Sequence, residues 1–267
     1  MALPRTAPID ARWFQIGSLG ALLAANIAWF DLAATTPQSV VTIAAALAFQ
    51  ALFCRWRGVP FDPLSPLITG LSLGLLLHTH DPLIWIAAPG LAMASKFLLR
   101  INGKHVCNPA TFAIVALLGL GANVWVSPGQ WGSAMWLAAL LVCLGGLVLS
   151  RARRIDTAGA FITCYAGLLL LRAVWLGDPL TIPLHQLQSG ALLLFTCFMI
   201  TDPRTTPDHP AGRLLFAAAV AALAYHLQFV WQVRTGLFFA LAAVSLVTPI
   251  IDMLLRAPRF RWSLKEA

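Results

Sequence analysis

The stretch "SGALLLFTCFMITDPRTTP", residues 189–207, decides how this chain is organised. An apolar run that could lie in lipid ends abruptly in Thr-Asp-Pro, with the acid at Asp202. An earlier stretch, "TGLSLGLLLHTHDP" at residues 69–82, ends in nearly the same way, with Asp81 followed by proline. A short apolar segment closed by Asp-Pro is therefore present twice, and this repetition predicts two related halves.

Composition places the chain in a membrane. Of the 267 residues, 59% are hydrophobic and 10% are charged, whereas a soluble domain has roughly 45–50% and about 25%. Apolar runs that approach the roughly 20 residues needed to cross a bilayer recur along the whole chain. We therefore expect one membrane domain over residues 1–267, surrounded by the lipid bilayer.

Ten apolar segments, separated by charges and by Gly/Pro clusters, are predicted to be membrane helices of an all-α polytopic protein. The third, fifth and eighth are short, which is typical of tilted or broken helices that line a protein interior. The segments lie near residues 13–30, 38–54, 65–79, 83–100, 109–121, 133–150, 157–176, 187–201, 212–231 and 235–255.

The basic residues indicate an orientation. If the amino terminus is inside, sixteen of the eighteen Lys and Arg residues fall on the inner side, and only Arg172 and Arg234 lie near the outer face. Cytoplasmic loops are enriched in Lys and Arg, so we expect a multi-pass protein of the bacterial inner membrane with both termini cytoplasmic. The formal charge of +8 then reflects topology, and no nucleic-acid partner is expected.

The repeat extends beyond the Asp-Pro ends. "GVPFDPLSPLITGLSLGLLLHTHDP" at residues 58–82 resembles "GDPLTIPLHQLQSGALLLFTCFMITDP" at residues 177–203. The two copies are five segments apart, and an odd offset makes the second copy enter the membrane from the opposite side. We therefore expect two inverted five-helix repeats, at approximately 13–121 and 133–255, with a binding site or path near the midplane between them.

Three acids are candidates for an ion or proton path: Asp81, Asp202 and Asp252. The first two precede prolines, so the simpler interpretation is that each accepts backbone N–H groups where a helix begins. Asp202 is expected on the cytoplasmic side and Asp81 on the outer side. Asp252 lies within the last apolar segment, where acids are functional candidates by default, although Arg256, one turn later, would pair with it.

Asn108 and Pro109 match an N-cap followed by proline at the first helical position. A helix that begins here could also direct its N–H groups at an anion or a flavin phosphate. Lys104 is close in sequence and could assist in binding such a group, although it is equally consistent with an ordinary cytoplasmic charge.

Three stretches carry a resemblance to a known family. They are "HQLQSGALLLFTCFMITDPRTTPDHPAGRLLFA" at residues 185–217, "NGKHVCNPATFAIV" at 102–115 and "VTPIIDMLLRAPRF" at 247–260. In order and spacing the chain resembles the RnfD/NqrB family, the RnfD membrane component of the Rnf electron-transport complex and the NqrB component of the sodium-pumping NADH:quinone reductase. The resemblance implies ten helices in two inverted halves and a part in transmembrane electron transfer with other membrane or redox subunits.

The chain departs from that family at the cofactor attachment. Many members carry FMN esterified to a Thr of a Ser-x-Ala-Thr type motif, in an insertion between the fifth and sixth helices. The corresponding connection, Gly121 to Gly132, contains no Thr, and Leu192 follows the similar Ser189, Gly190 and Ala191. Covalent FMN is therefore not expected, and a non-covalent flavin (FMN or riboflavin) or quinone remains. The candidate residues for binding it are Lys104, Asn108, Pro109, Gly190, Thr201 and Asp202.

The leading hypothesis from the sequence is thus an inner-membrane subunit that takes part in electron transfer and could be a non-catalytic member of a membrane oxidoreductase complex. The rival is a small-solute or ion transporter or channel on the same inverted scaffold, and a third hypothesis is a scaffold that only docks partners. The sequence contains no GxGxxG, Walker or HExxH motif, and cysteine spacing predicts neither a metal site nor a disulfide framework.

Overall fold

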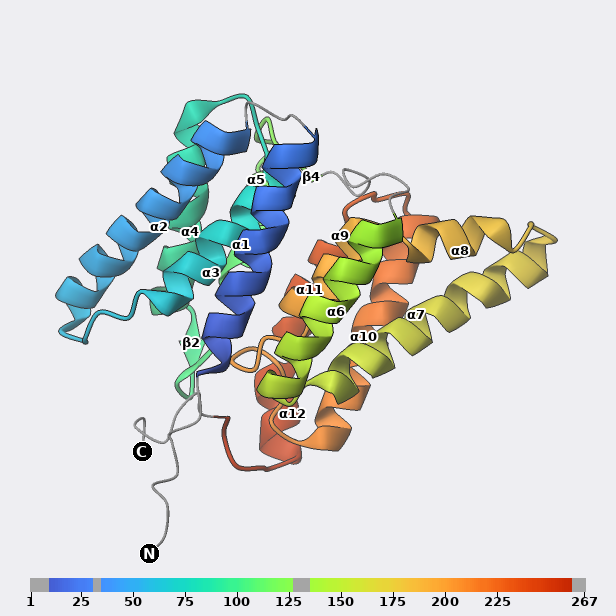
Figure 1. The fold of residues 1–267 in the computed structure, drawn as a ribbon. Coiled ribbons are helices and arrows are strands. Elements are labelled where there is room, and N and C mark those ends of the chain that lie inside the picture. The colour runs from blue at the N-terminus through green and yellow to red at the C-terminus, as the bar shows by residue number, and fades with distance from the viewer. Residues whose placement is uncertain (1–9, 31–34, 127–134, 261–267) are drawn as a thin grey trace, which may run out of the picture.

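A computed structural model describes residues 10–30, 35–126 and 135–260, and Figure 1 shows these as two helical bundles side by side. The ends of the chain and part of the connection between Gly121 and Gly132 lie outside the described residues. The first bundle consists of α1 (Ala11–Phe30), α2 (Thr35–Arg57), α3 (Leu64–Leu76), α4 (Pro82–Leu98) and α5 (Pro109–Gly119).

The second bundle contains two broken helices. The first is bent by 50° between residues 187 and 190 and continues as a π-helix, so that the eighth predicted segment begins at this break. The second, the tenth predicted segment, is bent by 43° at residues 246–247. Its elements are α6 (Met135–Ala152), α7 (Ile155–Leu176), α8 (Thr181–Leu187), α9 (Gly190–Leu194), the π-helix η1 (Phe195–Met199), α10 (Pro210–Phe229), α11 (Gly236–Ser245) and α12 (Thr248–Leu254).

Two small antiparallel ladders, which are not predicted from the sequence, join loops at the ends of the bundles. Strand β1 (Leu77–His78) pairs with β4 (Trp125–Val126), and β2 (Arg100–Ile101) pairs with β3 (Lys104–His105). Strands of two residues are too short for a period-2 pattern to reveal them. The second ladder is a hairpin that projects Lys104 from the first bundle toward the second.

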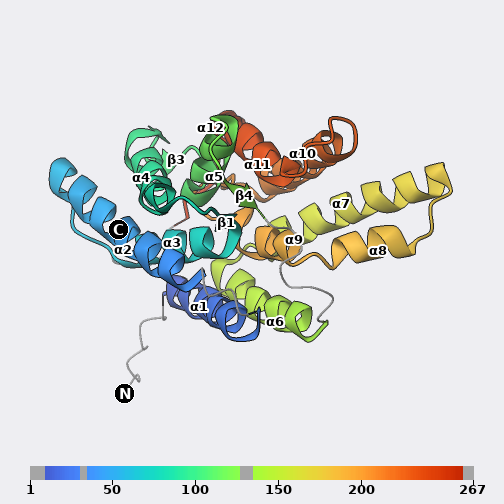
Figure 2. The ribbon, with the colours of Figure 1, turned by 90° about the horizontal axis from the view of Figure 1, so that it is seen from above.

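The two bundles are packed by equivalent helices. Helix α2 packs on α3 and α4, and α4 on α5; in the second bundle α7 packs on α8 and α10, and α10 on α11. Between the bundles α1 contacts α6 and α5 contacts α11. Figure 2 shows α1 beside α6 on one side of the molecule, with α5 and α11 on the other.

Polar caps fix where several helices begin. The Asp81 side chain accepts the N–H of Leu83 at 2.9 Å, and Pro82 stands at the first position of α4. Likewise His209 accepts the N–H of Ala211 at 3.1 Å where α10 begins with a proline. The capping role predicted for Asp81 is therefore confirmed.

Helix length and composition identify the protein as an all-α membrane protein. In the described part of the chain α2, α7 and α10 are long and apolar enough to cross a membrane, and the bent pairs α8 with α9–η1 and α11 with α12 raise the number to five. Shorter apolar helices, α3, α4, α5 and part of α6, lie among them. The number of ten crossings stays a prediction.

Candidate functional site

Charged and polar side chains from both bundles contact one another in one region. The β2–β3 hairpin lies there, at one end of the molecule (Figure 1). The second bundle contributes α12 and the loop of residues 201–208, which connects η1 to α10. We call this region the polar junction, and it contains five of the predicted site residues, Lys104, Asn108, Thr201, Asp202 and Asp252, with the predicted Pro109 next to Asn108.

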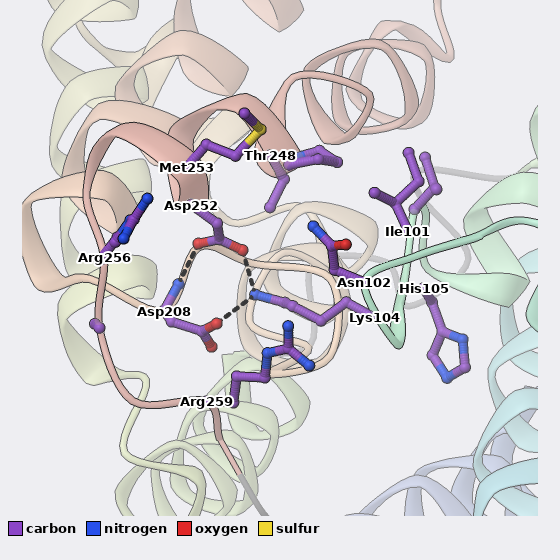
Figure 3. Close-up of a pocket in the computed structure, with 13 residues that line it drawn as sticks. Ile101, Asn102, Lys104, His105, Asp208, Thr248, Asp252, Met253, Arg256 and Arg259 are labelled. Carbon is purple, nitrogen blue, oxygen red and sulfur yellow. Dashed lines mark hydrogen bonds and ion pairs between the residues drawn. The ribbon is translucent and has the colours of Figure 1, made fainter.

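Lys104 is the centre of the polar junction. Its Nζ donates to Asp252 Oδ2 and to the carbonyl oxygen of Thr206, both at 2.8 Å, and lies 3.1 Å from Asp208 Oδ2. Figure 3 shows both carboxylates directed at the ammonium group. Because Asp252 Oδ1 also accepts the N–H of Asp208 at 2.9 Å, the three side chains form one connected network.

Asp252 therefore has a different partner from the one expected. Its carboxylate pairs with Lys104 of the first bundle, whereas the sequence suggested Arg256, one turn later on the same helix. Helix α12 ends at Leu254, before the position at which Arg256 would complete a helical turn over Asp252. The local i, i+4 rule fails because the helix stops.

Asp202 organises the loop of residues 201–208. Its Oδ1 accepts the N–H of Arg204 at 3.0 Å, and its backbone carbonyl accepts the N–H groups of Thr205 and Thr206 at 3.1 Å. Thr201 is buried and donates its hydroxyl back to the Cys197 carbonyl at 2.8 Å. In this structure Thr201 thus stabilises the helix end, while Asp202 holds the following turn.

Asn108 connects this loop to the first bundle. Its Nδ2 donates to Asp202 Oδ2 at 3.1 Å. Its Oδ1 accepts the N–H groups of Ala110 and Thr111, at 3.1 and 3.2 Å, and Pro109 occupies the first position of α5. The predicted cap is confirmed, and the same amide also forms a contact between the bundles.

Burial shifts the pKa of two groups here. It raises the pKa of Asp202, although the Arg204 N–H and the Asn108 side chain act in the opposite direction. Burial, reinforced by the nearby charges of Lys96 and Arg100, lowers the pKa of His105 to about 3. His105 is therefore neutral near pH 7, and its Nδ1 is buried without a partner among the described residues.

Two arginines of the second bundle also bind the loop of residues 201–208. From the sequence, these arginines are predicted only to lie on the cytoplasmic side of the membrane. Arg154, which is 4% exposed, donates to Thr206 Oγ1 at 3.3 Å. Arg213 donates to Asp156 Oδ2 at 2.7 Å and to the Asp208 carbonyl at 2.9 Å. Arg154 is 52 positions from Thr206 and Arg213 is 57 positions from Asp156, and the distribution of basic residues along the sequence does not predict such pairs.

Cavities of different character adjoin the helices. The Lys104 cavity, about 350 Å³, is lined by charged residues of the hairpin, the 201–208 loop and the chain around α12. The Asn108 cavity, about 60 Å³, lies between the bundles and also touches Asp202, Ser65 and Thr69. The Tyr165 cavity, about 270 Å³, is lined mainly by residues of α7, α9, α10 and α11.

Two predicted residues lie away from the polar junction. Gly190 begins the helix of residues 190–199, and Asp202 follows the opposite end of this helix. Ser189 and Ala191, on either side of Gly190, line the Tyr165 cavity. Asp81 follows α3 and β1, whereas Ser65 near the start of α3 touches the Asn108 cavity. The structure thus separates Asp81 and Gly190 from the other predicted residues.

The cavities beside the predicted residues differ in size. Small-molecule sites usually enclose roughly 300–1,000 Å³. The Asn108 cavity, at about 60 Å³, lies well below that range, and binding of a flavin or quinone by Asn108, Pro109 and Asp202 stays a prediction. The Tyr165 cavity, at about 270 Å³ and with Phe229 and Phe238 in its wall, comes close to that range.

Comparisons with known proteins agree on one family. The profile of the NQR2, RnfD, RnfE family matches residues 119–261, more than half of the chain. The chain is 28% identical to the D subunit of the ion-translocating oxidoreductase complex of Stutzerimonas stutzeri, over 81% of this chain and 82% of that protein.

Two further proteins described as the D subunit of an ion-translocating oxidoreductase complex give similar values. The one from Shewanella amazonensis is 29% identical, over 94% of this chain and 71% of its own length. The one from Alcanivorax borkumensis is 26% identical, over 90% of this chain and 74% of its own length. The similarity therefore covers both bundles.

Proposed function

The chain belongs to the NQR2, RnfD, RnfE family, and from this premise we propose that it is the membrane subunit of an ion-translocating oxidoreductase complex. The similarity to proteins described as the D subunit of such complexes, over most of both chains, carries the proposal. Its partners are the other subunits of that complex, and the bilayer is its surroundings. Whether it is itself catalytic depends on a bound redox group.

The arrangement within the membrane is proposed to be two inverted five-helix repeats. The packing pattern supports this, because each contact of α2 with α3 and α4 has a counterpart made by α7 with α8 and α10. The α1–α6 and α5–α11 contacts are those that a twofold axis between the bundles would produce. On this arrangement the polar junction and both termini face the cytoplasm of a bacterial inner-membrane protein.

A flavin or quinone, if one is bound without a covalent link, is proposed for the Tyr165 cavity. Aromatic rings bind planar cofactors by stacking, and Tyr165, Phe229 and Phe238 offer them there. Gln228, which is hydrogen-bonded to Tyr165, and Arg234 supply polar groups for ring oxygens or nitrogens. Such a group would supply electron transfer, and the protein would orient it and exclude water.

The ion path remains a separate proposal. Asp202 touches the Asn108 cavity, whose wall on α3 carries Ser65, Thr69 and Ser72. Polar side chains inside an apolar bundle mark ion or proton routes in membrane proteins. Asp81, at the far end of α3, and Asp252, on the opposite side of the loop, are the proposed continuations. The same wall would serve the rival function, a small-solute or ion transporter.

Isolation of the tagged protein from membranes in mild detergent tests the redox proposal. Other subunits of a redox complex should co-purify, and absorbance with mass spectrometry should detect a flavin or quinone. Tyr165→Ala should lose that group. The chain has two tyrosines, and Tyr225→Ala is the matched control because Tyr225 does not line the cavity.

Wild-type protein without a flavin, a quinone or a redox subunit would contradict the redox proposal. Solute or ion flux in liposomes by that same protein would then favour the transporter. Equal loss of cofactor in the two tyrosine variants would contradict the position in the Tyr165 cavity while leaving the proposed membership of the complex intact.

A further inference from the structure

The Lys104 cavity has an excess of positive charge. Its charged side chains are Lys104, Arg256 and Arg259 against Asp208 and Asp252. Both carboxylates pair with the Lys104 ammonium group, and Asp252 also accepts a hydrogen bond from the Asp208 N–H. Lys104 and the two carboxylates together keep one negative charge, so the two arginines leave the cavity with a net charge of +1.

Arg256 and Arg259 lie in the chain that follows α12, on the rim of this cavity (Figure 3). In residues 10–30, 35–126 and 135–260 neither guanidinium pairs with a carboxylate. Arginine binds phosphate oxygens in a bidentate manner, and both guanidinium groups belong to residues that line the same cavity.

Thr248 provides an independent sign of a missing ligand. Its side chain lines the cavity and is 4% exposed. Its Oγ1 is buried and has no hydrogen-bond partner among the described residues. Buried hydroxyl groups are normally satisfied, and a phosphate oxygen in the cavity would satisfy this one.

An apolar surface continues from the cavity along α12. Ile250, Met253 and Leu254 are exposed there, as is Leu246 just before the helix. Met253 belongs both to this surface and to the cavity wall. An anion held at the arginines would therefore have a hydrocarbon-binding surface beside it, in a protein whose helices lie in lipid.

We propose that the Lys104 cavity binds the headgroup of an anionic phospholipid, with its phosphate at Arg256 and Arg259 and its acyl chains along α12. A free phosphate would use the arginines and Thr248 but not the exposed apolar side chains. Clustered basic residues between membrane helices recognise anionic headgroups in other proteins. This site is separate from the Tyr165 cavity and does not depend on a redox group.

The test compares the full-length protein in mixed micelles containing phosphatidylglycerol, phosphatidylethanolamine or phosphatidylcholine. Binding is measured by native mass spectrometry and by the rise in melting temperature. Phosphatidylglycerol should bind most tightly. The double variant Arg256→Gln, Arg259→Gln should weaken it by about tenfold or more, and Thr248→Val should weaken it by less.

The matched control is Arg55→Gln, Arg153→Gln, which removes the same charge from two exposed arginines outside the cavity. It should bind phosphatidylglycerol like the wild type. Equal weakening in both double variants would reduce the effect to net charge and overturn the proposal. Equal binding of all three lipids, or stabilisation by inorganic phosphate that matches phosphatidylglycerol, would also overturn it.

Discussion

Asn108 and Asp202, 94 positions apart in the chain, are joined by a hydrogen bond of 3.1 Å from Nδ2 to Oδ2. Asn108 caps the start of α5 in the first bundle, and Asp202 follows η1 in the second. The amide that caps a helix with its oxygen therefore binds the other bundle with its nitrogen. The Asn108 side chain thus stabilises both the start of α5 and the contact between the bundles, and substitution of Asn108 tests both roles.

Asn108→Ala removes both contacts. Loss of the cap costs about 1 kcal/mol, and loss of a hydrogen bond to a charged acceptor costs roughly 1.5–3 kcal/mol. The melting temperature in detergent should fall clearly. Asn123→Ala is the control, because the Asn123 side chain makes no hydrogen bond in the described part of the chain. Equal melting temperatures for the two variants would contradict the double role of Asn108.

Asp202 should make the protein less stable as pH rises. Its pKa is raised in the folded protein, so the folded state holds the proton more tightly than the unfolded state does. The stability that protonation provides is complete below the unfolded pKa, about 3.9, and is lost as pH rises through the raised pKa. Melting temperatures measured across this range should show the loss in the wild type and less of it in Asp202→Asn.

Lys104→Met should destabilise the polar junction. It leaves Asp208 and Asp252, which are largely buried, as neighbouring carboxylates without their cation, and breaking such a pair costs about 3 kcal/mol. Lys104→Arg should keep most of the stability, and Arg55→Met should change little because Arg55 is exposed. The melting temperatures of the three variants check this order, and a Lys104→Met value close to the Arg55→Met value would refute it.

Gly145 should not tolerate a methyl group. A Cβ added there would lie 2.5 Å from Cys197 Sγ and 2.7 Å from its Cβ, where α6 meets η1. Overpacking of this kind typically costs about 1–3 kcal/mol. Gly146, the next residue, has open space at the same atom, so Gly146→Ala should be stable. If both alanine variants melt at the wild-type temperature, α6 and η1 are not in this contact.

The proposed orientation predicts a labelling pattern. In a variant without native cysteines, Arg55→Cys and Arg153→Cys should react with a membrane-impermeant maleimide only from the cytoplasmic side. Leu180→Cys and Trp231→Cys, at exposed positions near the other ends of α7 and α10, should react only from outside. Labelling of all four from one side would exclude the inverted arrangement.

Local features of this fold were predictable from the sequence. Asp81 and Asn108 cap helices as expected, because an acid or amide followed by proline acts on N–H groups two or three residues away. The apolar segments likewise contain helices close to the predicted bounds. Both features depend only on residues that are close in sequence, so neither prediction required tertiary contacts.

The partners across the molecule could not be predicted. Asp252 pairs with Lys104, 148 positions away, and a helical i, i+4 rule pointed to Arg256 instead. From the sequence, Arg154 is predicted only to be a charged residue on the cytoplasmic side. In the structure it is buried against the loop of residues 201–208. The π-helix of Phe195–Met199 was hidden too, since a run of apolar residues has the same composition whether its turns are α or π.

The polar junction also constrains how the two bundles can move. The Lys104–Asp252 ion pair and the Asn108–Asp202 hydrogen bond join the two bundles at one end of the molecule. At the other end lies the mainly apolar wall of the Tyr165 cavity. A rotation of one bundle against the other would pivot about the fastened end, so its largest displacement, and any widening of a passage, would occur at the opposite face.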